Sequence, residues 1–214
     1  MKTTLDFNPH KYGFALHSTS PQLGLALSNF TNPSLCQTFA LGRDLSSQLH
    51  LQILEFLQPY CWQDLAFISV AKGPGSFTST RIGMVTARTL AQQLNIPLFV
   101  FYSLAAIAWL EADKHSQKPI AIEMPARRNQ LFVGIYQAST DGLVQILPDT
   151  TTEAASWQNI LNGLDSYKLI QTPANLGYTV TSLLELALLS WQQGNQPHWQ
   201  SALPFYGQHP VSNC

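Results

Sequence analysis

The sequence is poor in charged residues. Only 11% of its 214 residues are Asp, Glu, Lys or Arg, and the net charge is −1, whereas globular domains carry about 25% charged residues. So little positive charge makes this chain alone a poor binder of polyanions, because Lys and Arg contacts to phosphate dominate nucleic-acid binding. Ser, Thr, Asn and Gln take the place of charge, and a weakly charged surface favours partial coverage by a partner protein.

The sequence also lacks the patterns of metal sites and membrane spans. Its three cysteines form no Cys-x-x-Cys motif, and its six histidines form no His-x-x-x-His or His-Glu pair. Widely spaced cysteines indicate a reducing compartment without a disulfide framework. No segment reaches the ~18 apolar residues of a membrane span, and no signal-peptide pattern is present. These absences predict a cytoplasmic protein with no membrane attachment.

The strongest local pattern is a glycine-rich stretch at residues 71–83, Ala-Lys-Gly-Pro-Gly-Ser-Phe-Thr-Ser-Thr-Arg-Ile-Gly. An apolar run of strand length precedes it at 66–70, and helix formers follow at 84–94. The stretch therefore predicts a strand, a tight turn and the start of a helix. Gly73 and Gly75 permit backbone angles or close approaches that a Cβ would block.

The turn is a candidate anion site. Ser76 and Thr78 are candidate N-caps, and open N–H groups at a helix start attract anions. Arg81 lies near enough in sequence to contribute, and Ser18 and Thr19, in a second hydroxyl-rich turn, are further candidates for holding phosphate. The spacing matches neither a Walker loop nor a complete dinucleotide fingerprint. The alternative is that none of these groups holds a ligand. The glycine turn would then be a capped turn, Arg81 would be solvated, and the turn with Ser18 and Thr19 would face solvent.

The rest of the chain predicts an α/β fold. Alternating strands and helices from 66 to 111 imply parallel crossovers, and a polar break at 114–118 suggests two units, 1–112 and 113–214, with the C-terminal tail packing back on the first. Strands are expected at 12–16, 23–28, 36–41, 66–71, 96–102, 119–123, 131–137, 144–147 and 167–171. Helices are expected at 44–58, 84–94, 103–111, 152–161 and 179–192.

Small residues recur every four positions in the helix after the turn, at Gly83, Ala87 and Ala91. Such a stripe lets another backbone approach closely. One interpretation is that this helix packs on the chain's own sheet. The other, more specific interpretation is that it packs across a protein–protein interface. The preceding helix carries an apolar stripe that includes Leu49 and Ile53.

Residues 73–78, Gly-Pro-Gly-Ser-Phe-Thr, followed by Arg-Ile-Gly at 81–83, resemble the glycine motif of the TsaB (YeaZ) family, bacterial proteins of the threonylcarbamoyladenosine tRNA-modification pathway. The segments Asn-Ile-Pro at 95–97, Tyr-Ser-Leu at 102–104 and Leu-Pro-Phe-Tyr at 203–206 support the resemblance. Weaker similarity spans most of the chain, and about 60 central residues carry most of it.

The resemblance implies two subdomains with mixed sheets in the actin-like, Hsp70-like and sugar-kinase superfold. It implies a non-catalytic partner of TsaD, which carries the metal and transfers the threonylcarbamoyl group to the tRNA adenosine 3′ of the anticodon. The resemblance further implies that a TsaE-like ATPase binds the assembly and that tRNA is contacted indirectly, through the complex. Pairing with TsaD would use the helices around the glycine motif, and homodimers can form through the same helices. We expect no cofactor on this chain alone, with ATP or ADP bound only within the complex. The expected interface residues are Gly83, Ala87, Ala91, Leu49 and Ile53.

One departure bears on the alternatives. Relatives carry Asp-Thr-Ser where this chain has His17, Ser18 and Thr19, so a carboxylate for metal-bound nucleotide is missing. A nucleotide-dependent phosphotransferase or ATPase that uses Ser18, Thr19 and the glycine turn is the first alternative. A diverged relative without the modification role is the second. A peptidase is a third alternative, because the family has historically carried that label. The sequence shows no Ser/His/Asp arrangement and no zinc-ligand pattern that would support it.

Overall fold

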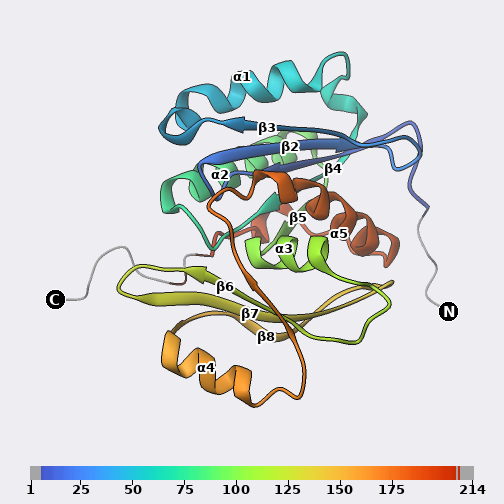
Figure 1. Cartoon of the computed structure of the whole chain (residues 1–214). Coiled ribbons are helices and arrows are strands. Elements are labelled where there is room, and N and C mark those ends of the chain that lie inside the picture. The colour runs from blue at the N-terminus through green and yellow to red at the C-terminus, as the bar shows by residue number, and fades with distance from the viewer. Residues whose placement is uncertain (1–5, 206, 208–214) are drawn as a thin grey trace.

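The structure is a computed structural model and describes residues 6–205 and 207. Its helices and strands are stacked in layers (Figure 1). Helices α1 and α2 cover the outer face of a first β-sheet, α3 and α5 lie between this sheet and a second one, and α4 covers the outer face of the second sheet. The predicted α/β architecture with two mixed sheets is confirmed.

The first sheet has the strand order β3-β2-β1-β4-β5. Its first three strands are antiparallel neighbours, and β4 and β5 run parallel to β1. The parallel connection from β4 to β5 passes through a helix, as expected for a crossover. The strands are β1 Tyr12–His17, β2 Gln22–Ser28, β3 Leu35–Ala40, β4 Leu65–Ala71 and β5 Leu98–Phe101.

The outer face of this sheet is covered by α1 (Leu45–Leu57) and α2 (Phe77–Leu94). The apolar stripe predicted for α1 is buried there, because its members recur at four-residue steps. Helix α2 begins at Phe77, seven residues before the expected start at Met84, so most of the glycine-rich stretch after the turn is helical.

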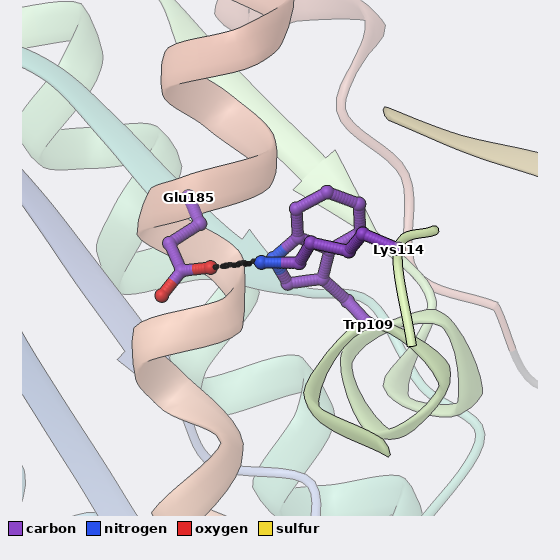
Figure 2. Close-up of polar contacts among 3 residues, drawn as sticks. All are labelled: Trp109, Lys114 and Glu185. Atoms are coloured by element: carbon purple, nitrogen blue, oxygen red, sulfur yellow. Dashed lines mark hydrogen bonds and ion pairs between the residues drawn. The ribbon is translucent and has the colours of Figure 1, made fainter. Parts of the chain in front are cut away.

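Between the sheets lie α3 (Ser103–Glu111) and α5 (Val180–Gln192). Figure 2 shows how their side chains join them: the Trp109 indole on α3 donates a 2.7 Å hydrogen bond to the Glu185 carboxylate on α5. Lys114 pairs with the same carboxylate oxygen at 3.3 Å and lies 4.1 Å from the centre of the indole ring. One carboxylate thus ties the two helices to the loop after α3.

The second sheet has the order β8-β7-β6-β9, with β6 and β9 parallel and the other pairs antiparallel. Strand β8 runs well past the expected end at residue 147, because three consecutive threonines at 150–152 favour an extended chain. Trp157 of α4 is buried against the sheet and donates to the Glu123 carboxylate at 2.6 Å. The elements are β6 Ile120–Pro125, β7 Gln130–Ser139, β8 Gly142–Glu153, β9 Lys168–Gln171 and α4 Ala154–Asn162.

The two sheets are formed by residues 12–101 and 120–171, on either side of the expected break. The division at residue 112 stays a prediction, and α5 shows that a simple cut does not follow the packing. This helix belongs to the second half of the sequence, yet Val180, Leu183 and Leu184 pack on the first sheet. Short 3₁₀ helices occur at Gly42–Asp44, Trp62–Asp64, Gly177–Thr179 and Trp199–Ser201.

Within the described residues, the helices are too short or too polar for any of them to span a membrane. The C-terminal tail was expected to pack back on the first unit. Phe205 does so through its amide bond to the Lys72 carbonyl, whereas the Gly207 carbonyl accepts a hydrogen bond from Thr151 of β8. Residue 206 lies outside the described residues.

Candidate functional site

The glycine turn packs directly against the turn between β1 and β2. The Ser76 amide donates a 2.7 Å hydrogen bond to the Thr19 carbonyl, and a Cβ on Gly75 would collide with that carbonyl. Gly73 has φ +104°, a conformation that favours glycine. Both glycines are therefore required by the backbone geometry, whether or not a ligand is present.

The hydroxyls of the β1–β2 turn are buried and engaged. Ser18 Oγ donates to the Ser79 carbonyl at 3.0 Å, and Thr19 Oγ1 lies 2.9 Å from Ser103 Oγ. Gly83 leaves the space that the Ser18 side chain fills. The structure thus brings Ser18 and Thr19 beside the glycine turn, where their hydroxyls hold the two turns together instead of pointing to solvent.

The start of α2 lacks the side-chain cap that its sequence predicted. Ser76 occupies the N-cap position but donates to Ser79 Oγ at 3.0 Å, and Thr78 is exposed inside the first turn of the helix. In α3 the N-cap position is held by Tyr102, and Ser103 is the first residue of that helix. The first N–H groups of α2 therefore receive no cap from Ser76 or Thr78.

A surface hollow of about 430 Å³ opens beside this helix start. Arg43 and Ser46 form one wall, and Ser76, Thr78 and Ile82 contribute to the other. Arg81 is exposed outside the hollow, with its guanidinium 5.4 Å from the centre of the Phe77 ring. Cationic and hydroxyl groups thus lie near the start of α2. Arg43 was not among the residues predicted from the sequence, because it precedes Gly73 by 30 residues.

His17 lies at the end of β1, where relatives are expected to carry a carboxylate. Its side chain is fully buried, and neither ring nitrogen has a hydrogen-bond partner. Burial lowers the pKa of His17 to about 3, because the buried site disfavours the charged imidazolium. The imidazole is therefore neutral near pH 7 and supplies no negative charge for a metal ion. In the described ranges, His, Cys, Asp and Glu side chains form no group that would hold a metal.

The five residues assigned from sequence to a partner interface lie in the chain's own core. Ala87, Ala91, Leu49 and Ile53 are buried between the helices and the first sheet, and Gly83 packs on Ser18. The small residues are needed because α2 lies close to β1 and β4. The expectation that these side chains contact a partner is therefore wrong, and the packing alternative is correct.

Other side chains on the same two helices are exposed. Leu51 and Leu54 on α1 and Val85 on α2 are large apolar residues on the solvent side, with Val85 60% exposed. Each falls between members of a buried stripe, so their exposure follows from helical periodicity once the buried face is known. Any contact made by this face would use these side chains.

Comparison with known proteins identifies the fold. Two solved structures have the same arrangement, "YeaZ from Pseudomonas aeruginosa" (TM-score 0.73) and a Pseudomonas aeruginosa protein described as having similarity to peptidase YEAZ (TM-score 0.76). Each is 19% identical and covers 92% of this chain, which in turn covers 99% and 100% of theirs. The chain has the two-sheet α/β fold of these proteins, and its place in the actin-like superfold stays an expectation from the resemblance.

Sequence comparison then gives the family. Residues 52–186 match the family model described as "TsaD: tRNA N6-adenosine threonylcarbamoyltransferase". The Bacillus subtilis "tRNA threonylcarbamoyladenosine biosynthesis protein TsaB" is 41% identical over 103 residues, and its Buchnera aphidicola (Acyrthosiphon pisum) namesake is 30% identical over 82 residues. These matches cover 48% and 38% of this chain, but only 44% and 37% of the two relatives. The chain belongs to the family of that model, tRNA N6-adenosine threonylcarbamoyltransferase (TsaD), and parts of it are similar to the two TsaB proteins.

Proposed function

We propose that the chain is a non-catalytic partner subunit in the modification of tRNA with threonylcarbamoyladenosine, acting in the cytoplasm. A TsaD-like protein would carry the metal and transfer the threonylcarbamoyl group to the adenosine 3′ of the anticodon. A TsaE-like ATPase would bind the assembly, and tRNA would be contacted through the partner.

The observation that carries this proposal is the exposure of large apolar side chains on the solvent side of α1 and α2. Leu51, Leu54 and Val85 face solvent in a chain that has few charged residues. Large apolar side chains exposed on the outer side of two neighbouring helices favour contact with another protein. The relatives are named as threonylcarbamoyladenosine biosynthesis proteins, and this supports the choice of partner.

The test is to reconstitute the chain with the TsaD-like and TsaE-like proteins of its own organism. Mass spectrometry of nucleosides would detect threonylcarbamoyladenosine in tRNA, and size-exclusion chromatography would detect pairing. We expect modified tRNA only when the chain is present. Pairing without modification would favour the diverged-relative alternative, and ATP hydrolysis by the chain alone would favour the enzyme alternative.

A pair of matched variants tests the surface. Val85→Glu should weaken pairing at least about tenfold, roughly 1.4 kcal/mol, because a carboxylate would be buried at the contact. Val144→Glu is the control, since Val144 is a similarly exposed valine (63%) but lies on β8 of the second sheet. Equal pairing by both variants would refute the α1–α2 surface. The same comparison in the absence of partners tests whether homodimers use this surface.

We also propose that the isolated chain binds no ATP or ADP at the glycine turn and that nucleotide binds only within the complex. Two features support this: Ser18 and Thr19 are engaged in internal hydrogen bonds, and His17 supplies no carboxylate. Calorimetric titration of the isolated chain with Mg-ATP should show no binding, while the assembled complex should bind. Magnesium-dependent binding by the chain alone would overturn this proposal.

A further inference from the structure

The two sheets end in four edge strands, and three of these are protected against the addition of another strand. On β5 the Leu98 amide already donates a 3.1 Å hydrogen bond to the Pro197 carbonyl of the chain's own loop. Strand β8 contains Pro148 and has an irregular register with β7. Strand β9 has only four residues, and its Lys168 pairs with Glu111 at 2.8 Å. Covered, irregular, short or charged edges resist strand addition.

The fourth edge strand, β3, has none of these protections. Its six residues, Leu-Cys-Gln-Thr-Phe-Ala, include no proline and no charged residue, and they pair with β2 without a shift of register. All of them except Phe39 are exposed. The absence of charge extends beyond the strand, because residues 12–42 contain no Asp, Glu, Lys or Arg. A regular, uncharged and exposed edge is open to pairing with another strand.

The backbone groups on the free side of β3 can be identified by following the hydrogen bonds across the first sheet. Successive residues of a strand direct their N–H and C=O groups to alternate sides. The Ile68 amide on β4 donates to the Pro97 carbonyl just before β5, so Ile68 faces β5 and Ser69 faces β1. Ala15, opposite Ser69 in the parallel pair, therefore directs its groups to β2 and bonds to Ala26.

The same alternation continues from β2 to β3. Leu25, the neighbour of the β2 residue bonded to β1, faces β3 and bonds to Gln37. The residues on alternate positions, Cys36, Thr38 and Ala40, therefore direct their N–H and C=O groups away from the sheet. Within the described residues these groups make no hydrogen bond. We refer to the N–H groups of these three residues as the outward amides.

We propose that β3 pairs with β3 of a second copy of this chain, antiparallel and in a register centred on Thr38, so that the two first sheets become one continuous sheet. In this register Thr38 lies opposite Thr38 of the second copy, and Cys36 lies opposite Ala40 of the second copy. Each outward N–H then meets an outward C=O. The inference does not rest on the proposed function, and it uses an element other than α1 and α2.

Three features favour a second copy over a strand of a different protein. The same three residues supply donors and acceptors on both sides, as a two-fold axis requires. Because β3 is uncharged, two copies bring no like charges together, and the strand offers nothing that would select an oppositely charged partner. Leu35, 45% exposed, would lie diagonal to Phe39 of the second copy on the same face, where the exposed side chain gains cover.

The size of the contact sets the expected strength. A pair of six-residue strands is small beside the ~1,200 Å² that stable complexes bury, so we expect weak association that depends on protein concentration. In the part of the chain that the structure describes, β3 is the one unprotected edge. A two-fold contact uses this edge on both copies, so assembly should stop at a dimer.

The test is amide hydrogen exchange, followed by NMR, on the full chain at low and high protein concentration. The outward amides should exchange freely at low concentration. Their exchange should slow about tenfold once roughly 90% of the chain is paired, because exchange then occurs only through the unpaired fraction. The amides of Leu35, Gln37 and Phe39, which bond to β2, should be protected at both concentrations and serve as the internal control.

Three results would overturn the proposal. The first is outward amides that stay unprotected at the highest concentration at which the chain is soluble. The second is protection that appears only when another protein is added, which would assign the edge to that protein. The third is self-association that leaves the outward amides free, as pairing through α1 and α2 alone would do.

Matched variants, compared by sedimentation velocity, test the register. Thr38→Lys places two ammonium groups opposite each other and should weaken self-association at least about threefold, because charges about 6 Å apart repel even at the dielectric constant of water. Thr150→Lys is the control, since it makes the same change at an exposed threonine on β8, the edge of the second sheet. Equal association by the two variants would refute the contact at Thr38, and species larger than a dimer would refute its two-fold symmetry.

Discussion

Replacing His17 by leucine should remove part of the acid sensitivity of the fold. The wild-type imidazole is buried and neutral, with a pKa lowered to about 3 by desolvation, whereas in the unfolded chain the ordinary value of 6.5 applies. Between pH 6.5 and pH 3 the His17 imidazole is therefore protonated in the unfolded state and neutral in the folded state. The free energy of unfolding falls as pH decreases, until the folded-state pKa is reached.

The expected size can be worked out for an accessible interval. Between pH 7 and pH 5 the proton taken up by the unfolded state costs the fold about 2 kcal/mol, because the pH passes well below the unfolded pKa but stays above the folded one. His17→Leu lacks this proton. At pH 7 the variant should be at least as stable as the wild type, since it removes two buried nitrogens that have no partner.

The assay is urea unfolding at pH 5, 6 and 7, followed by tryptophan fluorescence. The quantity to compare is the stability difference between variant and wild type, because the contributions of other titrating groups cancel in it. This difference should grow in favour of His17→Leu by about 2 kcal/mol as pH falls from 7 to 5. His50→Gln, at an exposed position of α1, is the control and should show no such trend. A difference that is constant with pH would refute the reasoning.

Three further substitutions test the packing. Gly83→Ala should cost about 1–3 kcal/mol, seen as a lower melting temperature, because its Cβ would collide with Ser18 Oγ; an unchanged melting temperature would show that α2 can shift away. Ile53→Ala should lower the urea midpoint by an amount equivalent to about 2–5 kcal/mol without changing the slope, because it empties a buried site, and a loss below 1 kcal/mol would contradict that burial. Trp109→Phe should cost about 0.5–1.5 kcal/mol in the same assay through its lost bond to Glu185, whereas Glu185→Gln, which keeps an acceptor oxygen, should cost less.

Local patterns predicted most of the secondary structure. Helix α1 follows from its four-residue apolar spacing, and the strands from short apolar runs bounded by turn residues. These features depend on residues that are close in sequence, so a single sequence is enough to predict them. The start of α2 at Phe77 and the continuation of β8 through residues 150–152 were not predicted from the sequence. Both depend on what each segment packs against.

The candidate site was predicted in part. The glycine turn and the β1–β2 turn were each candidates for holding an anion, and they lie together in the structure. The stripe of Gly83, Ala87 and Ala91 was misassigned because small residues permit close packing on any neighbour, and spacing does not say whether that neighbour is the chain's own sheet.

The placement of α5 has a consequence for how the protein is made. The strands of the first sheet are complete once residue 101 has been synthesised, but the helix that covers their inner face begins only at residue 180. At about 5–20 residues per second the ribosome needs roughly 4–16 s to add the intervening chain. During that interval the side chains of Phe67 and Ala15 lack the cover that α5 provides. A nascent chain stalled before residue 180 should therefore be a substrate for chaperones that bind exposed apolar sheet.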